Sequence, residues 1–295
     1  MTRKTEILEI VQETQEYERT KSITTAKMKR GKSMVSLIVP VYNEAPFLKR
    51  CFDSIKNQTV PFDEVIVVDD CSTDGSREIV QAYKEAIRTL HTVNLGVSVS
   101  RNDGLSDATG EYVTFLDADD ELMPDAHEKM LKAIKEHPVA PVIQFNHLRH
   151  YAKINKTVKK YSNLEGWYGI SDIGSMQGWW GVWNKVIWRK AIKYPFRPDM
   201  RYGEDGIWIL EHLLYGWSIW QEDTETVIHH FENENSLTKS KTKEQLQALE
   251  KVQRELLEAH CSIGEPWENI RAIVGVIEKC KNDPNCQKIM KGNGE

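Results

Sequence analysis

Residues 35–76 read VSLIVPVYNEAPFLKRCFDSIKNQTVPFDEVIVVDDCSTDGS, and this stretch decides the fold. It opens with an apolar, β-rich run, and the run EVIVVDD at 64–70 repeats that texture. Between the two runs, Leu48, Phe52 and Ile55 recur at the spacing of one helical face. Two apolar strands joined by an amphipathic helix predict a parallel unit whose strands are covered on both faces.

The alternation of strands and helices continues beyond this stretch. Residues 74–87 are predicted to form a second helix, and a loop then leads into a helix that ends near Gly110. EYVTFLD at 111–117 is predicted to be a strand, and 124–137 a further helix. Strands that alternate with helices of this length predict an α/β fold, with a mostly parallel sheet flanked by helices.

The pattern loosens in the second half of the chain. The Trp-rich run at 178–192 is interpreted as helix-like, and two amphipathic helices are predicted at 243–260 and around 267–277. The last two would pack either on their own domain or on a second copy of the chain, as a homo-oligomer. The predicted parts are an N-terminal helix and basic linker at 1–33, a catalytic body at 34–238 with halves at 34–135 and 136–238, and a helical tail at 239–295.

Composition is that of an ordinary soluble globular protein, with 40% hydrophobic and 28% charged residues among 295. A net charge of −5 argues against a nucleic-acid partner. The sequence shows no membrane span and no signal-peptide core, so a cytoplasmic location is expected. The basic residues at 27–32 suggest a linker, with contact to the inner face of a membrane as the alternative. The five cysteines lack CxxC spacing, which favours reduced thiols over zinc or disulfides.

Polar residues follow three of the predicted strands, and most of them are carboxylates. Glu44 follows the first strand, Asp69 and Asp70 end the second, and Asp117 ends the strand at 111–117 and is followed by Asp119 and Asp120. Since ligands bind at the carboxyl ends of strands in open α/β sheets, these groups should face one site. Carboxylates that share a site repel one another, so a divalent cation or hydrogen-bond donors should join them. Hard oxygen ligands favour Mg²⁺ or Mn²⁺, whereas a solvated turn is the simpler alternative.

Four separated motifs carry a resemblance to a known family. They are residues 35–76, NLGVSVSRNDGL at 94–105, GEYVTFLDADDELMPD at 110–125 and, more faintly, GED at 203–205 followed by HHFENENSLT. In order and spacing they resemble the nucleotide-sugar domain of the family 2 glycosyltransferases, which are inverting enzymes of the GT-A fold. The resemblance covers residues 35 to about 130 and extends weakly to about 238.

The resemblance implies a role for individual side chains of the sugar-donor site. Asp70 would accept a hydrogen bond from uracil, Arg101 would meet the diphosphate, and Asp119 would be the direct metal ligand. The residues expected to bind the nucleotide sugar are Pro40, Tyr42, Glu44, Asp70, Arg101, Asp117 and Ala118. Those expected at a Mn²⁺ or Mg²⁺ ion are Asp119, Asp117 and His229.

The acceptor side is less defined. The resemblance implies that Asp205 deprotonates the acceptor hydroxyl, with Glu204 as its rival, because an inverting displacement needs a base near the incoming group. Asp205 would otherwise suit the N-terminus of the helix that follows it. Trp179 and Trp180 are candidates for a stacking face that binds a sugar acceptor, although most tryptophans of this run are expected in the core.

These features predict a metal-dependent inverting glycosyltransferase that moves a sugar from a UDP-sugar to a hydroxyl of a carbohydrate or glycoconjugate. Synthesis of bacterial surface polysaccharide is the setting that the family implies. One alternative is a catalytically silent protein that binds a nucleotide sugar or glycan. Another is a phosphatase of the haloacid dehalogenase type, which VTFLDAD resembles, although Glu121 stands where that class usually has Thr or Val.

Overall fold

The computed structural model describes residues 34–159, 165–172, 178, 180–230 and 242–262. The expected helix and linker at 1–33 and the second helix of the tail lie outside these residues. The strands are β1 (Val35–Val41), β2 (Glu64–Asp69), β3 (Ile87–Leu90), β4 (Tyr112–Phe115), β5 (Glu121–Leu122), β6 (Val142–Tyr151), β7 (Lys156–Lys159), β8 (Gly166–Tyr168), β9 (Lys185–Trp188) and β10 (Ile219–His230). The helices are α2 (Ala45–Lys56), α3 (Ser76–Ala82), α4 (Val97–Asp107), α5 (Ala126–Glu136), α6 (Glu204–Leu214) and α7 (Lys243–Ser262).

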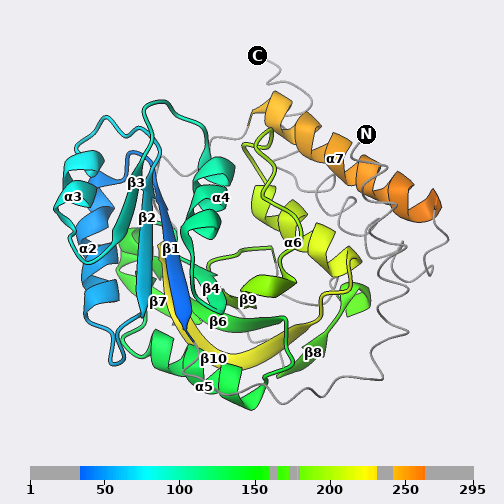
Figure 1. The fold of residues 1–295 in the computed structure, drawn as a ribbon, viewed down its shortest axis with the longest axis horizontal. Helices are drawn as coiled ribbons and strands as arrows, with labels where there is room; N and C mark the ends of the chain where they lie inside the picture. Colours follow the sequence, from blue (N-terminus) through cyan, green and yellow to red (C-terminus); the bar gives the residue numbers. More distant parts are fainter. Residues whose placement is uncertain (1–33, 160–164, 173–177, 179, 231–241, 263–295) are drawn as a thin grey trace.

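The first half of the chain builds the parallel part of the sheet. β1 lies between β2 and β4 and pairs with both in parallel, so that Ile38 is level with Ile66 and with Phe115. Every residue of β1 is buried, as expected for a strand covered on both faces. The predicted α/β fold with helices on both sides of the sheet is therefore confirmed, and the carboxyl ends of these strands meet at one edge (Figure 1).

The second half of the chain makes the sheet mixed. The strand order across the described residues is β3-β2-β1-β4-β9-β6-β10-β5. β9 is antiparallel to both β4 and β6, whereas β6 and β10 are parallel to each other. Antiparallel β9 joins the parallel strands β1 to β4 to the long pair β6 and β10, which curves away below them (Figure 1).

The two faces of β1 are covered by different helices. Leu37 and Val39 pack in one cluster with the buried face of α2, which includes Leu48 and Phe52. Ile38 faces the other side, toward α4, and Gly104 of α4 lies so close to it that a Cβ at this position would overlap the Ile38 side chain. The glycine of the RNDG motif therefore sets how closely α4 approaches the sheet.

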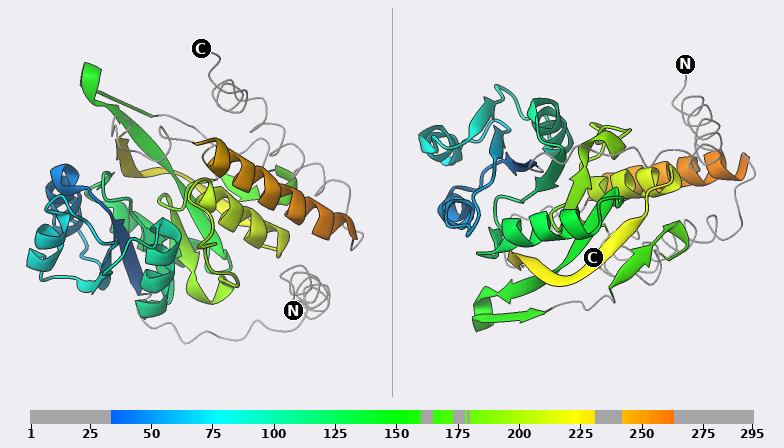
Figure 2. Two further views of the ribbon diagram at one scale, coloured as in Figure 1. Left: turned by 90° about the horizontal axis from the view of Figure 1, so that it is seen from above. Right: turned by 60° about the horizontal axis from the view of Figure 1, so that its bottom comes forward.

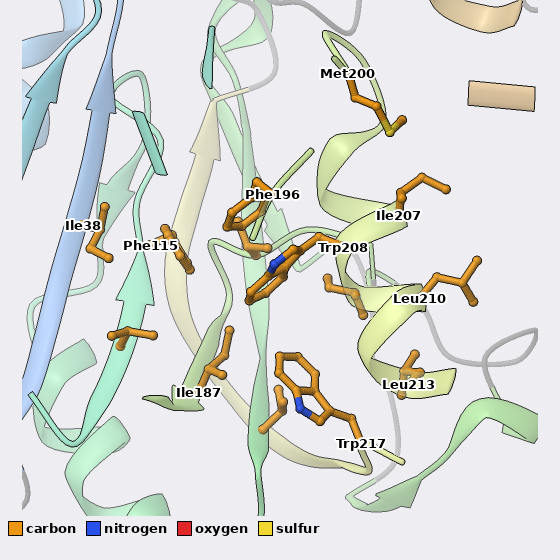
Figure 3. Packing of buried hydrophobic residues seen from close by; sticks show 14 of the residues in the cluster. Ile38, Phe115, Ile187, Phe196, Met200, Ile207, Trp208, Leu210, Leu213 and Trp217 are labelled. Carbon is orange, nitrogen blue, oxygen red and sulfur yellow. The ribbon is translucent and has the colours of Figure 1, made fainter. Parts of the chain in front are cut away.

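The cluster around Ile38 joins the sheet to α6 and α7. Trp208 of α6 stacks on Phe196 with ring centroids 4.3 Å apart, and Phe115 of β4 meets both rings edge-on (Figure 3). Leu249 and Leu256 of α7 are buried in this same cluster, and α7 lies along α6 in both views of Figure 2. The first helix of the tail thus packs on its own domain, and truncation of Leu249 to Ala would cost about 2–5 kcal/mol.

Two sequence-based assignments of secondary structure are wrong. Ile87, expected on the second helix, begins β3, because α3 ends at Ala82. The run at 178–192, interpreted as helix-like, contains β9, in which Val186 pairs with Thr114 and with Ile143. A short apolar run does not distinguish a buried strand from a helix, and pairing on both sides decides the outcome here.

Candidate functional site

Two polar loops at the carboxyl edge of the sheet are fastened to each other. Ser72 Oγ accepts from the Asn43 N–H at 3.0 Å, and Asn43 Oδ1 accepts from the Thr73 N–H at 2.8 Å. The Glu44 N–H donates to Ser76 Oγ at 2.8 Å. Asn43 and the residue after Asp70, Cys71, both have positive φ (55° and 65°). The loops after β1 and β2 therefore stabilise each other's conformation. These hydrogen bonds explain why Ser, Thr and Asp residues are frequent in this part of the sequence.

The residues expected around the nucleoside differ in exposure. Pro40 is buried within β1, whereas Tyr42, directly after β1, is 47% exposed and Glu44 is half-buried. Tyr42 thus presents an aromatic face at the edge of the sheet where a base could stack. Ala118 is buried beside Asp117, in the loop that follows β4.

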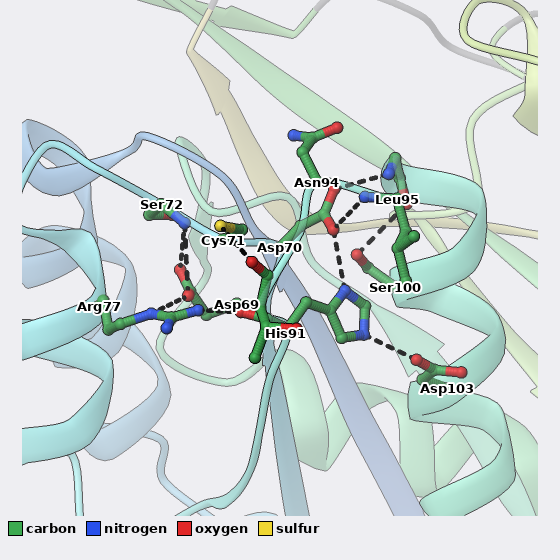
Figure 4. A network of polar contacts seen from close by, with 12 residues as sticks. Asp69, Asp70, Cys71, Ser72, Arg77, His91, Asn94, Leu95, Ser100 and Asp103 are labelled. Atoms are coloured by element: carbon green, nitrogen blue, oxygen red, sulfur yellow. Dashed lines mark hydrogen bonds and ion pairs between the residues drawn. The ribbon is translucent and has the colours of Figure 1, made fainter.

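Asp70 is almost fully buried, and its carboxylate is bound by groups of the protein. Oδ1 accepts from the Leu95 N–H at 2.8 Å, and Oδ2 accepts from the Gly96 N–H at 2.7 Å (Figure 4). The ring of His91 makes a third contact, with Nδ1 2.8 Å from Oδ1. Asp70 therefore connects the end of β2 to the loop that leads into α4, and only Oδ2 keeps capacity for a further hydrogen-bond donor.

Arg101 lies at the centre of the polar groups and is 3% exposed. Its Nη2 is 3.1 Å from Asp117 Oδ1, and its Nη1 is 2.9 Å from Glu204 Oε1 and also bonds Asp205 Oδ1. The structure thus brings together four residues that the sequence placed on three separate motifs. The guanidinium expected at the diphosphate bridges the loop after β4 to the start of α6.

Three carboxylates share this one cation, and the pKa values of two of them, Asp205 and Asp117, are raised. Burial raises the pKa of Asp205 from 3.8 to about 8, with Glu204 and Asp117 adding to the shift and Arg101 opposing it. Burial also raises the pKa of Asp117, again against the effect of Arg101. Because a base works best with a pKa near the ambient pH, Asp205 has the properties of a general base.

The DADD loop is held by contacts with β10 and α2, and of the residues that make them the sequence did not point to Arg50. Asp120 is buried, and it accepts from the His230 N–H at 2.8 Å and contacts His229 Nδ1 at 3.0 Å. Arg50 of α2 donates to the backbone carbonyl of Asp119. Asp120 therefore binds this loop to the end of β10. Because His229 contacts Asp120 through Nδ1, its other ring nitrogen, Nε2, points away from Asp120.

The side chains proposed for a metal ion fit a site that is shared with a substrate. Within the described part of the chain, no three His, Cys, Asp or Glu side chains are arranged to hold an ion by themselves. Asp117 and Asp119 nevertheless offer hard carboxylate oxygens from one short loop. Mg²⁺ is commonly bound by one or two carboxylates together with substrate phosphates, so two carboxylates and His229 suit an ion that arrives with a diphosphate.

The acceptor side is described only in part. Trp180 is 42% exposed, and its Cβ lies next to Gly206, directly after Asp205. Trp179 lies outside the described residues. Trp183 is stacked on His229, with ring centroids 5.2 Å apart and the planes 6° from parallel. Trp180 is thus placed near the candidate base, whereas Trp183 supports the candidate metal ligand.

Sequence reasoning missed Lys185 as well as His91 and Arg50. Lys185 of β9 is fully buried, and its ammonium donates to the Gly181 carbonyl and, at 2.9 Å, to Asn184 Oδ1. It thereby holds the segment whose Val182 N–H lies 3.4 Å from Asp205 Oδ2. The only signal in the sequence is a lysine inside an apolar run, which indicates a buried charge with a specific partner.

The chain is similar in sequence to bacterial proteins named as glycosyltransferases. TuaG of Bacillus subtilis (strain 168), a glycosyltransferase named for teichuronic acid biosynthesis, is 41% identical over 117 residues, which cover 38% of this chain and 46% of TuaG. EpsH of the same organism, named a glycosyltransferase, is 27% identical over 212 residues, covering 67% of this chain and 60% of EpsH. The matched regions thus span about half of these relatives.

The fold matches a solved structure. The crystal structure of Staphylococcus aureus TarS 1-349 in complex with UDP-GlcNAc has a TM-score of 0.70, with 20% identity over 86% of this chain and 74% of TarS 1-349. This likeness confirms the predicted GT-A type architecture. Among the helices that the structure describes, none is long and apolar enough to cross a membrane.

The family itself is shown by a model that spans more than half of the chain. The model of "Glycosyl transferase family 2" matches residues 36–189, a range that begins in β1 and ends just after β9. It therefore contains the loops after β1, β2 and β4 and the whole of α4, which together carry the candidate sugar-donor site. The chain belongs to glycosyl transferase family 2.

Proposed function

We propose that this protein is an inverting glycosyltransferase that moves a sugar from a UDP-sugar to an acceptor hydroxyl. The observation that carries the proposal is the ion-pair group in which Arg101 joins Asp117 of the sugar-donor loop to Glu204 and Asp205 of α6. An inverting displacement requires a base close to the anomeric carbon on the side of the incoming hydroxyl, and this group joins the candidate base to the loop proposed to hold the sugar donor.

Each charged group has a task in this reaction. Asp205 takes the proton of the acceptor hydroxyl as that oxygen attacks, and its raised pKa lets it hold the proton at neutral pH. Glu204 shares the Nη1 of Arg101 with Asp205 and so helps to orient it. Arg101 supplies positive charge beside the departing diphosphate, where negative charge grows in the transition state.

The loop after β4 would hold a divalent ion through Asp119, with Asp117 and His229 nearby. A bound Mn²⁺ or Mg²⁺ supplies Lewis-acid stabilisation of the leaving diphosphate. The contribution of the chain is to fix Asp119 by the hydrogen bond from Arg50 to its carbonyl and by the contacts of Asp120 with β10. Tyr42 and Glu44 would border the nucleoside, and Oδ2 of Asp70 would accept from the uracil ring.

The setting proposed is synthesis of a bacterial surface polysaccharide or glycoconjugate. TuaG is named for teichuronic acid biosynthesis, and TarS of Staphylococcus aureus has been crystallised in complex with UDP-GlcNAc. We place the reaction in the cytoplasm or at the inner face of the membrane, where nucleotide sugars are made. The acceptor would be recognised by the half at 136–238, with Trp180 as a stacking face. The tail at 239–295, whose first helix packs on α6, would supply any contact with a second copy.

The principal alternative is a silent nucleotide-sugar or glycan-binding protein. A phosphatase of the haloacid dehalogenase type fits poorly, because that class carries its first Asp after the first strand of the domain, whereas Asp117 follows β4. The test is release of UDP from a panel of UDP-sugars with Mn²⁺ present, with and without saccharide acceptors. Turnover that Asp205→Asn abolishes, while the variant still binds the sugar donor, supports the proposal. Tight binding without turnover by the wild type favours the silent alternative.

A further inference from the structure

His91 lies directly after β3, between two carboxylates that belong to different elements. Its Nδ1 is 2.8 Å from Asp70 Oδ1 at the end of β2, and its Nε2 is 2.7 Å from Asp103 Oδ2 on α4. The side chain is only 8% exposed. Figure 4 shows the ring lying between Asp70 and Asp103, with a dashed contact from each of its nitrogens.

This geometry determines the charge of the ring. An ionised carboxylate can only accept hydrogen bonds, and a neutral imidazole carries one N–H. Both contacts are therefore hydrogen bonds at once only when His91 is the imidazolium cation. Burial by itself would lower the pKa of His91, but the hydrogen bonds to Asp70 and Asp103 outweigh it, and the net shift of the pKa is upward.

Asp70 connects His91 to the backbone at the start of α4. Its oxygens accept from the Leu95 and Gly96 N–H groups at 2.8 and 2.7 Å, and Gly96 precedes the first residue of α4. Gly96 has a φ of 93°, which a residue with a side chain rarely adopts. The same helix carries Arg101. His91 and Asp70 thus fix the entry into the helix that presents the central cation of the site.

An arginine of α3 also lies beside His91. Arg77 pairs with Asp69 at 2.8 Å and also donates to the backbone carbonyl of His91. The guanidinium of Arg77 contacts the backbone carbonyl of His91 and not its ring. The charged partners of the ring are therefore Asp70 and Asp103. Loss of the ring proton would leave two carboxylates facing a single N–H.

We propose that His91 is a positioning residue for the sugar-donor site, and that as an imidazolium cation it holds the loop at 91–96 and the start of α4 in the form that accepts a nucleotide sugar. The proposal rests on the proposed function for its ligand. It goes beyond that function because it makes the affinity for the sugar donor depend on pH through His91, which does not take part in the reaction.

The sign of the dependence follows from the direction of the shift. A histidine with a raised folded pKa contributes stability fully below its unfolded pKa of about 6.5, and that contribution is lost as pH rises through the folded value. The loop at 91–96 is therefore best ordered at the acid end of the range. Affinity for a UDP-sugar should therefore fall as pH rises. The ionised fraction of Asp205 increases over the same range, so the two effects of pH oppose each other.

The experiment measures binding and protonation separately. Titration calorimetry with UDP-GlcNAc and Mg²⁺ gives the Kd from about pH 6 to about pH 8.5, a range in which the ligand does not change charge. NMR of the histidine ring nitrogens reports the protonation of His91 without ligand. The variants are His91→Gln, which cannot titrate, and Asp103→Asn, which keeps the ring but removes one charge. His137→Gln is the matched control, because His137 pairs with Glu222 away from this site.

The expected result is a wild-type Kd that rises about threefold or more across the range, with a midpoint at the NMR pKa of His91. The midpoint of the rise in Kd moves to lower pH in Asp103→Asn. The rise itself is absent in His91→Gln and is retained in His137→Gln. Any contribution of Asp205 is common to all four proteins and cancels. A His91 that is neutral throughout, or a His91→Gln profile identical to that of the wild type, overturns the inference while leaving the proposed function intact. Failure of every protein to bind a panel of UDP-sugars overturns both.

Discussion

The carboxylates after β2 and those after β4 lie at the same edge of the sheet but are neutralised in different ways. Asp69 is paired with Arg77 and lies 3.4 Å from the Ser72 N–H. Asp70 is bound by two backbone N–H groups and by His91. Each negative charge at this strand end has dedicated positive or polar partners within the protein, and these contacts join β2 to α3 and α4.

The end of β4 has fewer cations than anions. Asp117, Glu204 and Asp205 all face Arg101, so three carboxylates share one guanidinium. Burial raises the pKa values of both Asp117 and Asp205, and neighbouring carboxylates add to the shifts: Asp120 for Asp117, and Glu204 and Asp117 for Asp205. The first strand end is therefore a framework, whereas the second has the incompletely neutralised carboxylates that the proposed function requires.

The largest effect is expected from Asp205→Asn, which removes the base but keeps the shape of the side chain. The rate of UDP release should fall by about 10²–10⁴-fold, while the Kd of the UDP-sugar stays close to that of the wild type. The folded protein binds the extra proton of Asp205 between pH 3.8 and about 8, so this residue lowers stability as pH rises. The Tm of the variant at neutral pH should therefore equal or exceed that of the wild type. A lower Tm would mean that Asp205 belongs to the framework.

The next effect is on stability and separates the two strand ends. Asp70→Asn leaves a buried amide facing donors that need an acceptor, so the free energy of unfolding should fall by about 2–3 kcal/mol. The comparison variant is Asp117→Asn, which relieves repulsion among the carboxylates around Arg101 and should cost less. Urea denaturation at one pH measures both. Equal losses in the two variants would contradict the distinction between framework and reacting groups.

A smaller effect is expected from pH alone. Because Asp205 must be ionised to act as a base, kcat/KM for the UDP-sugar should rise with pH and level off above about 8, the raised pKa of Asp205 in the free protein. Each unit of pH below that value should lower kcat/KM about tenfold. Initial rates of UDP release at UDP-sugar concentrations well below KM provide the profile, measured in His91→Gln so that the proposed pH dependence of donor affinity does not contribute. A rate that is flat between about pH 6 and about pH 8 would exclude Asp205 as the titrating base.

The two halves of the chain differed in how much the sequence could predict. The strands β1, β2 and β4 are mainly apolar, and α2 and α5 show one apolar face, so local patterns were sufficient. The strand β9 was missed because its state depends on pairing with β4 and β6, which no local pattern reveals.

The site shows the same limit. The carboxylates at the strand ends could be predicted because their position follows from the fold. The partners of those carboxylates could not. Arg101 meets Asp205 across 104 residues of sequence, and Asp120 meets His230 across 110. The bridging role of His91 could not be predicted from the sequence, because its contacts form only when β2, β3 and α4 pack together.

The loop after β4 is proposed to form a metal-dependent site for a nucleotide sugar. Titration of UDP with Mn²⁺ into the wild type, Asp119→Ala and the exposed control Asp53→Asn tests this site most directly. Mn²⁺ should tighten UDP binding by about tenfold or more in the wild type and in Asp53→Asn, and should have no effect in Asp119→Ala. Binding of UDP that is equally strong with and without Mn²⁺ in all three proteins would contradict a metal site in this loop.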